Sequence, residues 1–202
     1  MSSKVAPDRA KPRWRLFLAA SLSEAVRGAL TPPLDALASL RPKVDPSRLD
    51  AIHLTLHFLG NVELARVDDL SCGLPEAVGR FERFEVIVSG VGAFPSMVTP
   101  RIIWAGITGP DRSSLLALQA ATAAPLAGAG IALDDRPYAP HLTLARVRPE
   151  AGPRERRELA SWAERWADGR FGVLRIDAIQ LMRSDLAARP PRYTALESFP
   201  LQ

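Results

Sequence analysis

Cysteine is nearly absent from this chain of 202 residues, in which Cys72 carries the one thiol. A single cysteine excludes an intrachain disulfide and any metal site built from several thiolates. A disulfide-stabilised secreted domain is thereby excluded, and we expect the protein to work in the cytoplasm.

Long apolar runs are missing as well. The longest wholly apolar stretches, such as Ile102 to Ala105, hold a handful of residues, far from the ~20 that span a bilayer. Basic residues precede an apolar run at 16–20, as in a secretory signal, but Ser21, Ser23 and Glu24 interrupt it. We therefore expect no membrane interaction, and a flexible basic leader over residues 1–12.

Lysine is scarce, because Lys4, Lys11 and Lys43 are the only ones and 23 of the 26 basic residues are arginines. The formal net charge is +4 and the isoelectric point about 9.8. Arginine binds phosphate with two parallel hydrogen bonds, so a polyanionic partner fits this composition. Abundant arginine also arises from genome base composition, and the charge alone leaves the partner open.

Short strands alternate with helices along the whole chain. Alternating or continuous apolar residues predict strands at residues 14–20, 52–59, 84–89, 101–107, 141–147, 174–177 and 192–199. Helices are predicted to begin at Ser23 and Asp111 and to include Leu159, Trp162 and Trp166. Pro32 and Pro33 are expected to break or kink the first of these helices, and Pro125 is expected to disturb the last turn of the second. Several links between strands are too short for a crossover helix, which favours antiparallel pairing and an α+β fold.

A repeated tetrapeptide is the most informative feature. His53-Leu54-Thr55-Leu56 recurs as His141-Leu142-Thr143-Leu144, and each copy lies inside a predicted strand. Alternate side chains of a strand share a face, so each copy presents an imidazole and a hydroxyl on one side and two leucines on the other. Two such strands facing each other would bring together two imidazoles and two hydroxyls.

That set of groups suits a phosphate diester. One neutral histidine can take a proton from the nucleophile, while the other, as imidazolium, protonates the leaving oxygen. Thr55 and Thr143 can hydrogen-bond the non-bridging phosphate oxygens.

A metal site is the main alternative, because His53 and His57 are four residues apart. On a strand that spacing separates the Cα atoms by ~13 Å, which one ion does not bridge, and no acidic ligands accompany the histidines. We therefore expect no metal or other cofactor. His57 is predicted to share the face of His53, either lining a groove further out or pointing into solvent.

These residues resemble the two-histidine phosphodiesterases, and in particular the RNA 2',3'-cyclic phosphodiesterases of the 2'-5' RNA ligase family. The resemblance covers nearly the whole chain, and the segments that carry it are RLFLA at 15–19, HLTLHFLG at 53–60, RIIWAGI at 101–107, YAPHLTLARV at 138–147, LMRSDL at 181–186 and Arg192-Tyr193. It implies a single bilobal domain over residues 1–202, with pseudo-twofold antiparallel sheets that face a central groove and helices outside.

The resemblance also implies an activity, namely hydrolysis of a terminal RNA 2',3'-cyclic phosphate, or of a nucleoside 2',3'-cyclic phosphate, to a 2'-phosphate. His53 would then act as proton donor to the departing 3'-oxygen and His141 as proton acceptor from water. Tyr138 and Arg146 are further candidates for groove residues, and we expect a monomer.

Two other functions stay open at this point. The same site could join RNA ends by 2'-5' ligation, although water at ~55 M competes with a 5'-hydroxyl. A non-catalytic nucleotide-binding or RNA-binding module is the other alternative, but binding alone would not need both histidines and both threonines.

Overall fold

The computed structural model describes residues 12–40 and 43–202, so the predicted leader at 1–12 lies almost wholly outside the described residues. The strands are β1 (Arg13–Ser21), β2 (Val44–Pro46), β3 (His53–Glu63), β4 (Phe84–Phe94), β5 (Ile102–Thr108), β6 (His141–Val147), β7 (Arg170–Ile176), β8 (Ala178–Asp185) and β9 (Arg192–Pro200). The helices are α1 (Glu24–Ala38), α2 (Val67–Ser71), α3 (Leu74–Val78), α4 (Arg112–Gly128) and α5 (Pro153–Trp166), with short 3-10 turns η1 (Leu49–Ala51) and η2 (Leu64–Arg66).

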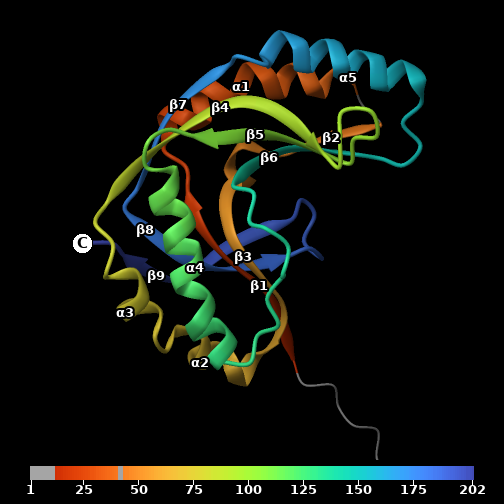
Figure 1. The fold of residues 1–202 in the computed structure, drawn as a ribbon. Helices are drawn as coiled ribbons and strands as arrows, with labels where there is room; N and C mark the ends of the chain where they lie inside the picture. The colour runs from red at the N-terminus through yellow and green to blue at the C-terminus, as the bar shows by residue number, and fades with distance from the viewer. Residues whose placement is uncertain (1–11, 41–42) are drawn as a thin grey trace, which may run out of the picture.

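The strands form one curled antiparallel sheet in the order β7-β4-β5-β6-β3-β1-β8-β9, with β2 beside β6 (Figure 1). The two strands that carry the repeated motif, β3 and β6, meet at its centre through the pair Leu54 and Leu142. Each is the inner strand of a four-stranded half, which gives the molecule its two-lobed, pseudo-twofold plan. The predicted α+β fold is confirmed.

The helices lie outside the sheet, as expected. Helix α1 packs on β7 and against α5, while α4 packs on α3, which contacts β9 (Figure 1). The Ser23 hydroxyl accepts a hydrogen bond from the Val26 amide and caps α1, as the sequence predicts.

The predicted break of the first helix at Pro32 and Pro33 is wrong. Helix α1 is continuous through Pro32 and Pro33, and α4 continues through Pro125. A proline removes one amide donor, but tertiary packing can hold the helix together. In α1 the buried face includes Pro33, Leu34 and Leu37, and the Trp162 indole donates a hydrogen bond to the Pro33 carbonyl at 3.0 Å.

The leucines of the two motifs lie in the core. Leu54, Leu56, Leu142 and Leu144 are all buried, whereas the histidines and threonines between them remain partly accessible. Burial of each leucine side chain stabilises the fold by about 1.5–3 kcal/mol, and this anchors the polar face of both strands. The sheet therefore presents two rigidly held His-x-Thr pairs at its centre.

Candidate active site

The register of β3 and β6 brings the two motifs into one place. Because the strands are antiparallel and Leu54 pairs with Leu142, His53 lies across from Thr143 and Thr55 lies across from His141. The two histidines are thus diagonal neighbours, whose Cα atoms are about 7–8 Å apart in such an arrangement.

Both imidazoles are oriented by the same backbone contact. The Nδ1–H of His53 donates to the Ala51 carbonyl at 2.8 Å, and that of His141 donates to the Ala139 carbonyl at 2.7 Å. A carbonyl can only accept, so Nδ1 keeps its proton and Nε2 is the atom that gains or loses one. Among the described residues neither Nε2 has a hydrogen-bond partner, which leaves both atoms available to a substrate.

Aromatic rings pack against each imidazole. Phe17 of β1 stacks on His53 with the ring centroids 4.5 Å apart, and Tyr193 of β9 meets its edge at 5.3 Å. Phe94 of β4 contacts His141 edge-on at 5.0 Å. Burial lowers the pKa of His53 below its ordinary value, while the bond to Ala51 opposes this shift.

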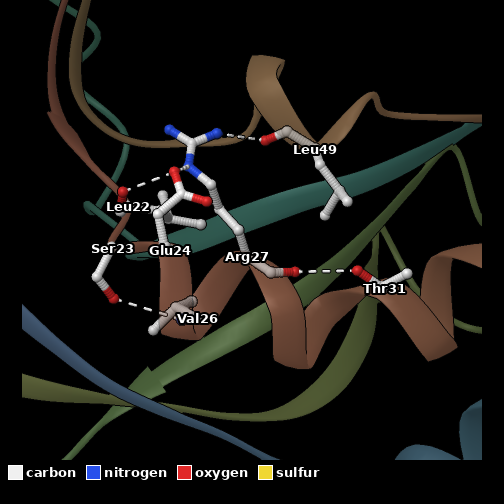
Figure 2. A network of polar contacts seen from close by, with 7 residues as sticks. All are labelled: Leu22, Ser23, Glu24, Val26, Arg27, Thr31 and Leu49. Atoms are coloured by element: carbon white, nitrogen blue, oxygen red, sulfur yellow. Dashed lines mark hydrogen bonds and ion pairs between the residues drawn. The ribbon is translucent and has the colours of Figure 1, made fainter.

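A chain of contacts connects helix α1 to the turn that precedes His53, and Figure 2 shows its first part, from Arg27 to Leu49. The Arg27 guanidinium donates to the Leu49 carbonyl at 2.6 Å and to the Leu22 carbonyl at 3.4 Å, and it lies 3.7 Å from the Glu24 carboxylate. Leu49 begins the turn η1, and Ala51, which ends it, supplies the carbonyl that holds His53. Arg27 therefore fixes the turn that orients the first imidazole.

Each motif strand contains a β-bulge directly after its threonine. In the pairing of β3 with β1, Thr55 and His57 pair with consecutive residues of β1, and Leu56 between them has no partner. In the pairing of β6 with β5, Thr143 and Ala145 pair with consecutive residues of β5, and Leu144 has no partner. A bulge shifts the alternation of side chains by one position. The fifth residue of each motif is consequently buried, and the sixth, Phe58 or Arg146, is exposed.

The bulge overturns the prediction that His57 shares the face of His53. His57 is 7% exposed, and its Nε2–H donates to the Gln119 carbonyl of α4 at 2.8 Å, with the Thr122 hydroxyl 3.2 Å away. Burial lowers the pKa of His57, and the bond to Gln119 opposes the shift. His57 borders a cavity beside the site, but its imidazole is engaged with α4.

The other two groove candidates have different surroundings. The Tyr138 hydroxyl donates to the Thr55 carbonyl at 2.9 Å, so this residue joins the segment before β6 to the backbone of β3. Burial raises the pKa of Tyr138 above its ordinary value, which keeps the hydroxyl protonated. Arg146 projects from β6 into the space beside His53.

Two cavities lie side by side along the site. One, of about 390 Å³, is lined by His53, Thr55, Thr143 and Arg146 together with Arg15 and Tyr193. The other, of about 610 Å³, is lined by His141 and Arg101, and Thr55 and Phe58 border both. In the described part of the chain, the guanidinium groups of Arg15, Arg101 and Arg146 have no ion-pair partner, so they can bind an anion.

Residues 12–40 and 43–202 contain neither a cluster of metal-binding side chains nor a helix that could span a membrane. No group of three or more His, Cys, Asp and Glu side chains in these ranges could hold a metal ion. The helices there are too short or too polar to cross a membrane.

Sequence reasoning missed several groups of the site. The aromatic partners Phe17 and Phe94 lie far along the chain from the histidines that they contact, and no local pattern identifies them. The residues whose carbonyls hold the two imidazoles are weakly indicated by the sequence, because an alanine stands two residues before each motif histidine. The exposure of Phe58 depends on the bulge, which no sequence pattern indicated.

A curled antiparallel sheet with two His-x-Thr motifs on adjacent central strands defines a class of two-histidine proteins. The 2'-5' RNA ligase superfamily matches residues 25–188, and the chain belongs to it. An RNA 2',3'-cyclic phosphodiesterase of Methanothermobacter thermautotrophicus is 31% identical over 187 residues, covering 93% of this chain and 98% of the relative. One of Thermus thermophilus is 32% identical over 197 residues, covering 93% and 90%. The family resemblance is thus confirmed.

Solved structures share the fold. TT0787 of Thermus thermophilus superposes with a TM-score of 0.75 at 28% identity, covering 92% of this chain and 97% of that one. LigT of E. coli, complexed with 3'-AMP, gives a TM-score of 0.70 at 24% identity and covers 95% and 99%; this likeness concerns the fold alone.

Proposed function

We propose that this protein hydrolyses the 2',3'-cyclic phosphate at an RNA end, or on a single nucleoside, to a 2'-phosphate, without a metal ion. The observation that carries the proposal is the matched pair of imidazoles, each with Nδ1 held by a carbonyl and Nε2 free. Membership of the 2'-5' RNA ligase superfamily, and relatives named RNA 2',3'-cyclic phosphodiesterase, support the same activity.

In the proposed reaction both proton transfers involve Nε2 atoms. Nε2 of neutral His141 accepts a proton from water as the water oxygen bonds to phosphorus. The bond from phosphorus to the 3'-oxygen breaks, and Nε2–H of protonated His53 gives its proton to that oxygen. The product keeps phosphate on the 2'-oxygen. A second water, or proton exchange between the histidines, then restores the starting protonation.

The remaining groups stabilise charge in this scheme. The hydroxyls of Thr55 and Thr143 donate to the non-bridging oxygens, whose negative charge increases as phosphorus becomes five-coordinate. Arg146 and Arg15, which have no ion-pair partner among the described residues, neutralise the phosphate and adjacent RNA. Tyr138 holds the backbone of Thr55 and acts as a positioning residue.

The experiment that tests this function is turnover of cytidine 2',3'-cyclic phosphate in excess chelator, with the product identified by phosphorus NMR. We expect cytidine 2'-phosphate at an undiminished rate. A 3'-phosphate product would contradict the assigned leaving group, and loss of activity restored only by a divalent cation would contradict metal independence. We further propose that the enzyme works as a cytoplasmic monomer, which size-exclusion chromatography with light scattering and cell fractionation would test.

A further inference from the structure

A short turn orients the first imidazole, and little within the turn itself holds it in place. The turn η1 consists of Leu49–Ala51, none of whose residues is fully buried, and no side chain caps its start. Turns of this 3-10 type have poor hydrogen-bond geometry and are weak on their own. The carbonyl of its last residue, Ala51, nevertheless accepts the Nδ1–H of His53 at 2.8 Å. The turn therefore needs support from elsewhere in the fold.

Arg27 of helix α1 provides that support (Figure 2). Its guanidinium donates to the Leu49 carbonyl at 2.6 Å, and the same carbonyl accepts the Ile52 amide at 3.4 Å, which closes the turn. The Arg27 side chain is 21% exposed, so this charge-assisted hydrogen bond is partly shielded from water. Glu24, which lies 3.7 Å from Arg27, is 96% exposed, and such an ion pair contributes little. The bond from Arg27 to Leu49 thus ties the turn to α1.

The second imidazole is anchored by a stiffer segment. Its carbonyl partner Ala139 is followed by Pro140, whose ring fixes its own φ and restricts the residue before it to an extended backbone. The corresponding residue before the first motif is Ile52, which leaves Ala51 free of that restriction. The dependence on Arg27 therefore belongs to one histidine, the one assigned as proton donor.

We propose that Arg27 is a positioning residue for the general acid: it fixes η1 so that the Ala51 carbonyl holds Nδ1–H of His53 and Nε2–H points at the departing 3'-oxygen. The inference rests on the proposed function, in which the bond from phosphorus to that oxygen breaks as His53 gives up its proton. Misplacement of a reacting group by about 1 Å through a remote change can cost on the order of 100-fold in rate. Arg27 lines neither cavity, so its loss should affect protonation of the leaving group rather than substrate binding.

A substrate whose leaving group needs no proton tests this proposal. Uridine 2',3'-cyclic phosphate is compared with its analogue in which sulfur replaces the 3'-oxygen, so that a phosphorus–sulfur bond breaks and a 3'-thiolate leaves. The pKa of a thiol, about 8.5 in cysteine, is far below that of an alcohol, and the thiolate leaves without a general acid. Arg27→Met should lower kcat for the oxygen substrate about 10- to 100-fold, with KM changed less than about threefold. For the sulfur substrate kcat should fall much less.

Four further variants calibrate the comparison. Arg27→Lys keeps the charge and one donor, so it should recover part of the rate with the oxygen substrate. His53→Ala should show the same dependence on the leaving atom, whereas His141→Ala should be slow with both substrates. Glu24→Gln is the matched control, because it removes the exposed partner of Arg27 and should leave kcat unchanged for both. The ratio of the two rates in one preparation does not depend on the folded fraction, so partial unfolding of Arg27→Met does not alter it.

A loss confined to the oxygen substrate supports the inference. An equal loss with both substrates in Arg27→Met, or no loss with either, would overturn it, and the proposed function would stand if His53→Ala still favours the sulfur substrate. If the wild-type protein turns over neither compound, the proposed function fails, and nitrogen-15 NMR of the neutral His53 ring at about pH 8 then decides whether Arg27 positions it. Arg27→Met should shift the ring from the Nδ1–H toward the Nε2–H tautomer, and an unchanged tautomer would overturn the positioning role.

Discussion

At the scale of single residues, the two histidines differ in their surroundings although they share one backbone contact. His53 is stacked on Phe17 and its pKa is lowered by burial, whereas His141 meets Phe94 only at an edge. An imidazole with a lowered pKa is a stronger acid once it is protonated. The environment of His53 therefore suits the donor role that the family resemblance implies.

The titration of His53 provides the first prediction. Its pKa, followed by NMR of the ring protons in the free protein, should lie below 6.5, because burial disfavours the imidazolium. Addition of uridine 2'-phosphate should raise it, since a nearby anion stabilises the charged ring. A pKa at or above 6.5 in the free protein would show that the packing against Phe17 does not desolvate the imidazole.

The threonines provide a second prediction at this scale. Thr55→Val and Thr143→Val should each raise the activation barrier, measured from kcat/KM, by about 1–3 kcal/mol, as expected for a lost hydrogen bond to a charged oxygen. Thr194→Val, at an exposed position on β9 outside both cavities, serves as the control. Full activity in both motif variants would exclude the hydroxyls from phosphate binding.

At the scale of elements, most strands and helices could be predicted from periodicity, and the exceptions have physical causes. The leucines of HLTL indicated correctly which face of β3 and β6 is buried. The buried position of His57 could not be predicted from the sequence, because it results from a bulge, and a bulge depends on the pairing of neighbouring strands. The continuity of α1 through Pro32 and Pro33 depends on packing that includes Trp162, which is distant in the sequence.

The contact between β3 and α4 leads to a third prediction. His57→Ala removes the hydrogen bond to the Gln119 carbonyl and should lower the free energy of unfolding by about 1–3 kcal/mol at about pH 7, measured in urea. The kcat of the folded variant should stay within about tenfold of wild type, because His57 faces α4.

The same contact has a pH dependence whose sign follows from the pKa. The pKa of His57 is lowered in the folded protein, so folding favours the neutral ring. Its contribution to stability is present above about pH 6.5 and is lost as the pH falls. Between about pH 7 and 5 the wild type should lose more stability than His57→Ala, and parallel curves would contradict this account.

At the scale of the whole molecule, two four-stranded halves meet at one pair of leucines and place two histidines, two threonines and several arginines along one site. The repeat in the sequence was sufficient to predict that two motifs come together, because both had the same polar and apolar pattern. It was not sufficient to predict the two cavities, whose walls come from strands far apart in the chain, such as β1 and β9.

The arginines lead to a prediction about salt. The affinity for an oligonucleotide ending in a 2',3'-cyclic phosphate should fall more steeply with salt than the affinity for a cyclic mononucleotide, because more phosphates are neutralised. Arg101→Gln, in the cavity beside His141, should reduce the oligonucleotide slope by about 0.7 in log–log units. Equal salt slopes for the two ligands would show that the excess of arginine does not contribute to RNA binding.

The central claim is that the two motif histidines carry out the proton transfers, and single-turnover hydrolysis by His53→Ala and His141→Ala tests it most directly. Each variant should remain folded and lose about 10²- to 10⁴-fold in rate, as expected for removal of a general acid or base. The double variant should lose far less than the product of the two single losses, since both residues act in one proton-transfer sequence. A folded His141→Ala protein that hydrolyses the cyclic phosphate at the wild-type rate would contradict the mechanism.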